Sequence, residues 1–188
     1  MKDLCVKIGG LGALLVCLPV IWRIYEGDAF NSVSYVLWSA LSLVCTIVLI
    51  RAKKGGHTLM ACYVLSDLLI GVYAYVHTGQ AHFGGIEWFI VALAAGCASV
   101  YVWCEYRKNF RPAVIMNGAS LVVAGIPQMV DSFRHPEHVS ILICSLYVLI
   151  SAFSYYGEKP TLNGRLIPVL SMVYWLVIIG ATIGAHYT

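Results

Sequence analysis

The stretch AGIPQMVDSFRHPEHV, residues Ala124–Val139, begins as an apolar helix, meets a Pro-Gln pair and becomes polar from Asp131 onward. A proline inside a helix removes a backbone hydrogen bond and clashes with the preceding turn, so Pro127 predicts a kink or a break. Gln128 brings a side-chain amide to the place where backbone groups are left free. This stretch therefore predicts a broken helix that ends at a polar boundary.

Composition indicates an all-α integral membrane protein. Of the 188 residues, 60% are hydrophobic and only 11% are charged, whereas soluble domains carry roughly 25% charged residues. Seven apolar segments are each close to the roughly 20 residues that a helix needs to cross a bilayer. The predicted spans are 8–25, 33–50, 58–77, 84–104, 112–131, 138–156 and 164–186.

The Lys and Arg residues are distributed unevenly between the two ends of these spans. One side holds the N-terminal tail and the second, fourth and sixth loops, with ten of the twelve basic residues; the other side holds Arg23 and Arg134. The positive-inside rule therefore predicts a cytoplasmic N-terminus and an outside C-terminus. Short loops and the absence of Asn-x-Ser/Thr patterns favour a bacterial inner membrane.

An internal duplication is suggested by the positions of the prolines. Pro127 follows Pro19 by 108 residues, and the same shift overlays spans one to three on spans five to seven. The predicted organisation is a first three-helix repeat (1–78), a linker helix (79–110) and a second three-helix repeat (111–188). An odd linker keeps the two repeats parallel, and parallel repeats around a midplane site are a transporter architecture.

The broken helix resembles a known motif. Gly125–Val130, followed by a charged turn, is similar to the second motif of the PQ-loop family, and Leu18–Ile21 is similar to the first, although Val20 stands where Gln is usual. That family includes the SWEET sugar transporters and cystinosin-like exporters. The resemblance implies a seven-helix 3+1+3 fold, transport of a small polar solute, and binding residues on the third helix of each repeat. Family members are usually drawn with the N-terminus outside, opposite to the charge prediction.

Asp67 is the strongest candidate for a functional residue. It lies near the middle of the third span, which contains no Lys or Arg. A carboxylate at the bilayer centre costs several kcal/mol unless it is paired, hydrated or protonated. We therefore expect Asp67 to contact substrate or to exchange a proton; the alternative is a protonated Asp that bonds to a neighbouring helix.

The 108-residue shift places Asp67 against Trp175 and Tyr63 against Ser171. Residues four apart share a helix face, so two equivalent faces are expected to line one cavity suited to a sugar or a zwitterionic amino acid. The alternative is ordinary packing of the aromatic residues. The predicted substrate-binding residues are Asp67, Trp175, Tyr63, Ser171, Tyr174 and Asn117.

Other residues have two interpretations each. Asn117 either lines the path or bonds across helices, and Trp38 is either a cavity wall or a packed side chain. Arg23 and Asp131 are related by the same shift and are predicted to form an outer gate by ion pairing, with solvated helix ends as the alternative. The predicted flexing points are Pro19, Pro127 and Gln128.

The predicted function is transport by alternating access. Transport would be proton-coupled if Asp67 exchanges a proton during the cycle, and no enzymatic activity is expected. The expected partners are a small-molecule substrate and the lipid bilayer; no nucleic acid, cofactor or metal is expected, and homo-oligomer formation is left open. One alternative is a metal-dependent lipid hydrolase that uses outer histidines; another is a PQ-loop-like cargo receptor. The histidines of that alternative are His77, His82, His135, His138 and His186, near Glu87, Asp131 and Glu137.

Overall fold

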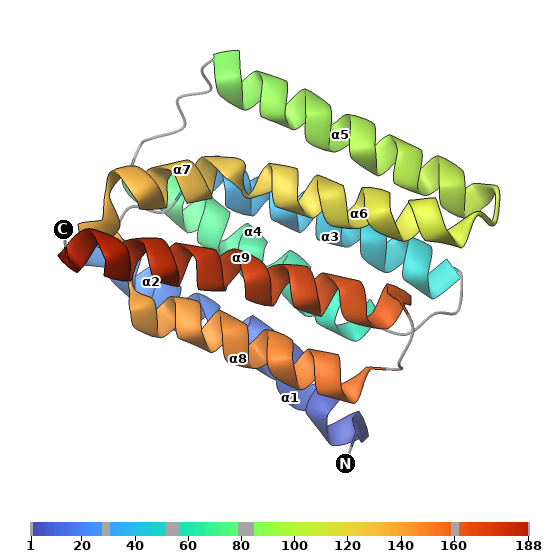
Figure 1. The fold of residues 1–188 in the computed structure, drawn as a ribbon, viewed down its shortest axis with the longest axis horizontal. Helices are drawn as coiled ribbons and strands as arrows, with labels where there is room; N and C mark the ends of the chain where they lie inside the picture. Colours follow the sequence, from blue (N-terminus) through green and yellow to red (C-terminus); the bar gives the residue numbers. More distant parts are fainter. Residues whose placement is uncertain (1, 28–30, 52–56, 79–84, 159–161, 188) are drawn as a thin grey trace.

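The computed structural model describes residues 2–27, 31–51, 57–78, 85–158 and 162–187, and these are helical throughout apart from short turns (Figure 1). The predicted all-α class is confirmed. The helices are α1 (Lys2–Leu15), α2 (Cys17–Tyr25), α3 (Ser32–Arg51), α4 (His57–Thr78), α5 (Gly85–Tyr106), α6 (Phe110–Ala124), α7 (Ile126–Arg134), the 3-10 helix η1 (Pro136–His138), α8 (Ile141–Gly157) and α9 (Leu162–Tyr187).

Five helical segments among the described residues are long and apolar enough to cross a membrane, which fits the predicted membrane-protein class. They are Lys2–Tyr25, Ser32–Arg51, His57–His77, Glu87–Tyr106 and Gly164–Ala185. Helix α8 is apolar but has only 17 residues, and α6 and α7 are separated at Gly125. The count of seven spans therefore stays a prediction.

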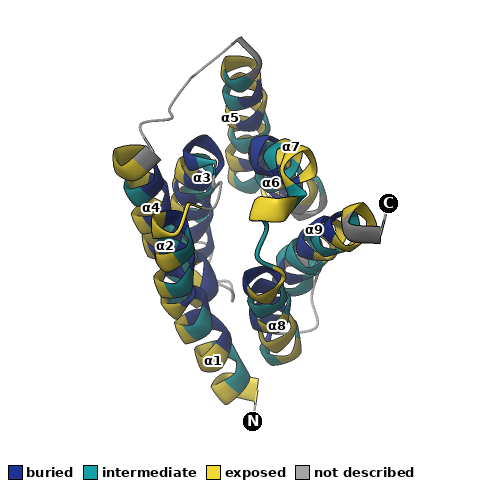
Figure 2. Cartoon of the chain, turned by 90° about the vertical axis from the view of Figure 1, so that its left-hand side faces the viewer, coloured by how far each residue is buried: buried dark blue, intermediate teal, exposed yellow. Residues whose placement is uncertain are grey.

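The helices form two layers (Figure 2). In the first layer, α4 packs between the α1–α2 pair and α3; in the second layer, α9 packs between α8 and the α6–α7 pair. Helix α1 packs against α8 across the layers, while α5 lies outside the second layer against α6. The colours of Figure 1 show that α1, α4, α6 and α9 run in one direction and that α3, α5 and α8 run in the other.

The helical runs that contain Pro19 and Pro127 are each interrupted just before the proline, whereas Pro168 lies inside the uninterrupted helix α9. Helix α1 ends at Leu15, whose carbonyl would accept from the N–H that Pro19 lacks. The predicted break near Pro127 is also present, because α6 ends at Ala124 and α7 begins at Ile126. Pro19 and Pro127 thus each sit in the first turn of the second helix segment, where the missing N–H is tolerated.

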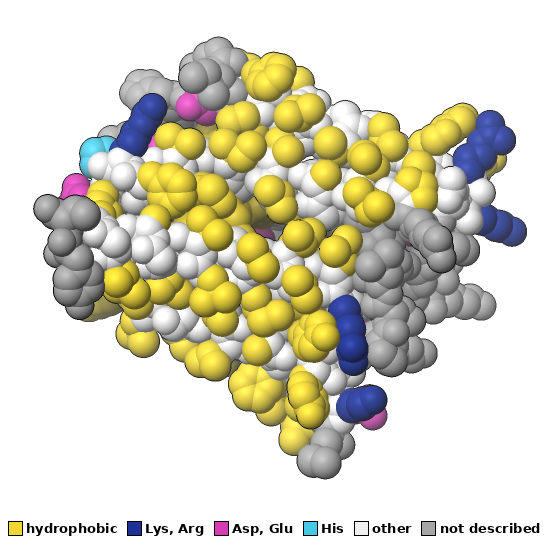
Figure 3. Space-filling view, viewed as in Figure 1, with side chains coloured by type: hydrophobic (Ala, Val, Ile, Leu, Met, Phe, Trp, Pro, Cys, Tyr) yellow, Lys and Arg dark blue, Asp and Glu magenta, His cyan; other side chains and the backbone are white. Residues whose placement is uncertain are grey.

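The surface carries the pattern expected of a chain embedded in a bilayer. Large apolar side chains are exposed along the helices, and Lys and Arg gather mainly toward one end of the molecule (Figure 3). Of the basic residues that entered the orientation argument, Lys53, Lys54 and Lys159 lie outside the described residues, as does the side chain of Arg111.

Candidate functional site

A cavity of about 90 Å³ lies between the two layers. Its walls come from α3, α4, α6, α8 and α9. The lining residues are Trp38, Ser42, Met60, Tyr63, Asp67, Leu121, Val122, Tyr147, Ile167, Leu170, Ser171, Tyr174 and Trp175. In the space-filling view, acidic atoms are visible in a hollow between α6 and α9 (Figure 3), and Asp67 is the one acidic residue of this lining.

The carboxylate of Asp67 is buried in the cavity wall and has no partner among the residues that the structure describes. The residue is only 5% exposed, and its side chain makes no hydrogen bond or ion pair with any described residue. The nearby groups are phenols: Tyr35, Tyr63 and Tyr147 each interact electrostatically with it. A buried carboxylate without a cation or a donor is costly, so this position calls for a ligand, a proton or water.

The two predicted faces meet at this cavity. Tyr63 and Asp67 reach it from α4, while Ser171 and Trp175 reach it from α9 in the opposite layer. The Ser151 hydroxyl donates to Ser171 Oγ at 2.8 Å. The Tyr63 hydroxyl is buried and lies near these two serines without reaching hydrogen-bond geometry. The cavity wall therefore holds a buried hydroxyl that has no hydrogen-bond partner among the described residues.

Aromatic rings form much of the remaining wall. Trp175 stacks on Tyr147 with ring centroids 4.4 Å apart, and Trp38 meets Tyr174 edge-on at 5.4 Å. Trp38 Nε1 donates to the Leu121 carbonyl at 2.8 Å, and the Tyr174 hydroxyl donates to the Gly125 carbonyl at 2.9 Å. These rings are thus fixed by carbonyls at and just before the break between α6 and α7.

Trp175 also lines a second, smaller cavity. The second cavity measures about 10 Å³ and is lined in part by Gln128, Ser132 and His138. Trp175 lines both cavities. A rotation of this one side chain would change the connection between them.

A hydrogen-bond network joins the start of α3 to α7. The backbone N–H of Gln128 donates to Ser34 Oγ at 3.1 Å, and the N–H of Asn31 donates to Gln128 Oε1 at 2.7 Å. Asn31 Nδ2 donates to Asp131 Oδ2 at 2.7 Å. The polar groups that follow Pro127 therefore bind the first layer, a role of Asn31 and Ser34 that sequence reasoning missed.

Two sequence predictions differ from what is found. Asn117 does not line the cavity; its amide donates to Cys45 Sγ at 3.3 Å, which is the cross-helix bond of the alternative interpretation. Arg23 and Asp131 form no ion pair with each other in the described part of the chain. Arg23 pairs with Glu26 at 2.9 Å instead, because the two side chains are only three residues apart at the end of α2.

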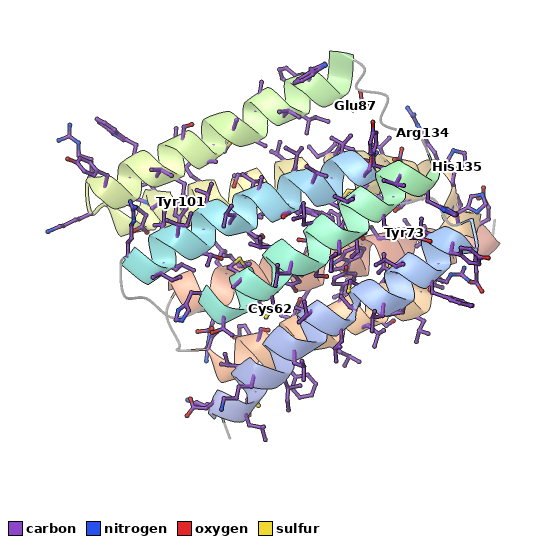
Figure 4. All side chains as sticks on the ribbon, turned by 180° about the vertical axis from the view of Figure 1, so that it is seen from behind. Cys62, Tyr73, Glu87, Tyr101, Arg134 and His135 are labelled. Carbon is purple, nitrogen blue, oxygen red and sulfur yellow. The ribbon has the colours of Figure 1, made fainter. Side chains whose placement is uncertain are left out.

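The outer histidines that the structure describes do not form a recognisable metal site. His135 Nδ1 and His138 Nε2 lie 3.5 and 3.7 Å from Glu137 Oε1. The backbone N–H of Glu137 and these imidazoles hold the pKa of its carboxyl below the usual value. His135 lies at the same end of the molecule as Arg134 and Glu87 (Figure 4).

No group of three or more His, Cys, Asp or Glu suited to a metal occurs among the described residues. His77 instead stacks on Tyr73, with ring centroids 5.4 Å apart. His82 and the side chain of His186 lie outside the described residues.

Comparisons with family models, curated protein sequences and solved structures gave no significant match. The site is therefore interpreted from its own geometry. Besides the predicted residues, the cavity wall includes Tyr147, Ser42 and Trp38. Sequence analysis missed Tyr147 and Ser42, although each carries a hydroxyl group within an apolar span, and this feature could have pointed to them.

Proposed function

We propose that this protein is a membrane transporter of a small polar solute, working by alternating access between two three-helix units. The observation that carries the proposal is the cavity between the layers, with the unpartnered carboxylate of Asp67 in its wall. Polar groups buried in a membrane-spanning bundle typically mark a substrate or ion path. A cavity walled by both layers is also the place where a parallel-repeat transporter binds its solute.

The 3+1+3 organisation is part of this proposal. Residues 1–78 and 111–188 are the two units and 79–110 the linker. Three features support it: each layer has its third helix in the middle, corresponding helices run in the same direction, and each unit begins with a proline-interrupted pair. The same features agree with the resemblance to the PQ-loop family. The proposal places the protein in a bacterial inner membrane.

Movement is needed for any larger solute. The cavity of about 90 Å³ is smaller than the roughly 150 Å³ cavity that accepts benzene in a protein interior. We expect the layers to separate on one side and then on the other, with Pro19 and Pro127 as flexing points. Trp175 is the expected barrier between the two cavities, and the Gln128 network is the contact that opens.

Proton coupling through Asp67 is the further element of the cycle. The groups that face this carboxylate are the phenols of Tyr35 on α3, Tyr63 on α4 and Tyr147 on α8, and no charged group among the described residues acts on it. Asp67 is thus the one carboxylate of the lining that can exchange a proton. Acid-dependent uptake is expected in the natural protein and not in Asp67→Asn; acid-dependent uptake by that variant would contradict the coupling.

A thermal-shift screen of the purified protein against sugars, amino acids, amines and nucleosides is the first test, with Asp67→Asn and Trp175→Ala in parallel. A solute present at 100 times its dissociation constant stabilises the folded state by about 2.7 kcal/mol. We expect a hit that both variants lose and that is taken up by proteoliposomes. Gly96→Ala is the control, since a methyl group there meets no atom within 4 Å. A hit that neither variant affects, or one that does not cross the vesicle membrane, would refute the proposal.

A further inference from the structure

We infer that the solute of this cavity is a small organic cation, with its charge on an ammonium-type nitrogen and no anionic group. The inference rests on the proposed function in taking the cavity as the solute site. It narrows the substrate class beyond the sugar or zwitterionic amino acid that the sequence alone suggests.

Charge is the first argument. Asp67 is the one charged residue among the described lining residues, it is only 5% exposed, and no described residue pairs with it. A bound cation would satisfy this carboxylate directly. With a neutral sugar the carboxylate would need a proton instead, and the carboxylate of a zwitterion would find no Lys, Arg or His among the described lining residues. Leaving one charge of a buried pair without its partner costs several kcal/mol.

The aromatic wall is the second argument. Trp38, Tyr147, Tyr174 and Trp175 line the same cavity as Asp67, from three different helices. Aromatic rings attract cations through their quadrupole, and the attraction grows when the cation is desolvated. Several rings around one carboxylate is the arrangement that recognises substituted ammonium groups.

Size and hydrogen bonding complete the argument. The cavity of about 90 Å³ suits only a small solute. The buried hydroxyl of Tyr63, one helical turn from Asp67, has no hydrogen-bond partner among the described residues, and a shift of the cavity wall would let it accept from an N–H or donate to a hydroxyl group. A small amine or amino alcohol matches these groups better than a hexose.

The test compares three probes of similar shape by thermal shift and isothermal calorimetry on the full chain in detergent. Choline carries one positive charge, 3,3-dimethylbutan-1-ol is its neutral isostere, and glycine betaine adds a carboxylate. Methylammonium and tetramethylammonium extend the cation series to smaller sizes. We expect at least one cation to bind at least about tenfold more tightly than the neutral and zwitterionic probes.

Matched variants locate the charge. Asp67→Asn keeps the shape and removes the charge, so cation affinity is expected to fall by at least about tenfold; Asp67→Glu is expected to retain part of it. Glu137→Gln, at an exposed carboxylate outside the cavity, is expected to leave affinity unchanged. The three-probe comparison needs no variant, so a poorly folded Asp67→Asn does not remove the test.

The outcomes separate this inference from the proposed function. Binding and vesicle uptake of neutral or zwitterionic solutes in preference to cations would overturn the cation inference and leave the transporter proposal standing. Cation binding that depends on Asp67, without uptake by proteoliposomes, would support the site and refute transport. Equal binding of choline and its neutral isostere, or no binding of any cation, would overturn the inference.

Discussion

At the scale of single residues, Tyr174 and Tyr147 line the same cavity but use their hydroxyl groups differently. The Tyr174 hydroxyl donates to the Gly125 carbonyl at 2.9 Å, at the helix break. That carbonyl also accepts from the Met129 N–H at 3.0 Å. The Tyr147 hydroxyl is buried and lies near the Tyr35 phenol without reaching hydrogen-bond geometry.

Tyr174→Phe is expected to lower the free energy of unfolding by about 0.5–1 kcal/mol, the usual contribution of a hydrogen bond inside a membrane protein. The loss stays small because Met129 still satisfies the Gly125 carbonyl. Equilibrium unfolding in mixed micelles measures it. Tyr147→Phe is the matched control and is expected to cost less; an equal loss in both variants would contradict the structural role given to Tyr174.

For single residues, the sequence predicted correctly which side chains share a helix face, because helical periodicity alone determines this. The four-residue spacing of Tyr63 and Asp67 put them on one face of α4, and both line the cavity. Whether they bind a solute stays a prediction. The partner of Asn117 was not predictable, because Cys45 lies 72 positions away and only the packing of α3 against α6 brings it within 3.3 Å.

At the scale of helices, glycine allows α4 to approach α3 closely. An ideal Cβ at Gly71 would lie 2.8 Å from Val36 Cγ2, 3.1 Å from the Val36 backbone nitrogen and 3.3 Å from Tyr35 Cβ. Small residues at such contacts are typical of helix pairs in membranes. A methyl group at Gly71 would therefore move the two helices apart.

Gly71→Ala is expected to destabilise the protein by about 1–3 kcal/mol through overpacking. Gly96→Ala is the matched control, because it adds the same methyl group in the middle of α5, where nothing lies within 4 Å. The control is expected to be neutral or to gain up to about 1 kcal/mol from helix propensity. Thermal unfolding in detergent compares the two; a Gly71 variant as stable as the Gly96 variant would disprove the close contact.

For the helices, the sequence predicted their positions but not all the residues at which they begin and end. The apolar runs predicted helical segments near the positions observed, since hydrophobicity marks a segment that spans a bilayer. The break positions at Val16 and Gly125 precede the prolines by three and two residues. A proline removes the hydrogen bond to the residue four positions earlier, but it does not decide the break alone, because Pro168 lies inside α9 without interrupting it.

At the scale of the whole molecule, the network between α3 and α7 was beyond sequence reasoning. Asn31 and Gln128 are 97 positions apart, and the bond between them exists because the two layers meet at this end. The sequence marked Gln128 as a polar group beside a break, but it gave no sign that the partner is the first turn of α3. Long-range partners of this kind depend on packing, which periodicity does not encode.

Orientation in the membrane is the property of the whole molecule that the charge distribution predicts. Lys7 lies in α1 and Arg107 directly follows α5, both at the basic end, and Glu137 lies in η1 between α7 and α8, which meet at the opposite end. We expect the basic end to face the cytoplasm, because cytoplasmic loops retain Lys and Arg.

Single cysteines at Lys7, Arg107 and Glu137, in a variant whose seven native cysteines are replaced by Ser or Ala, test this with a membrane-impermeant maleimide. Glu137→Cys should be labelled in intact cells, and Lys7→Cys and Arg107→Cys only after permeabilisation. Labelling of Lys7→Cys and Arg107→Cys from opposite sides would show that an odd number of spans separates them, and this result would contradict the seven-span count. Labelling of both from outside would reverse the predicted orientation and would agree with the arrangement usual in the PQ-loop family.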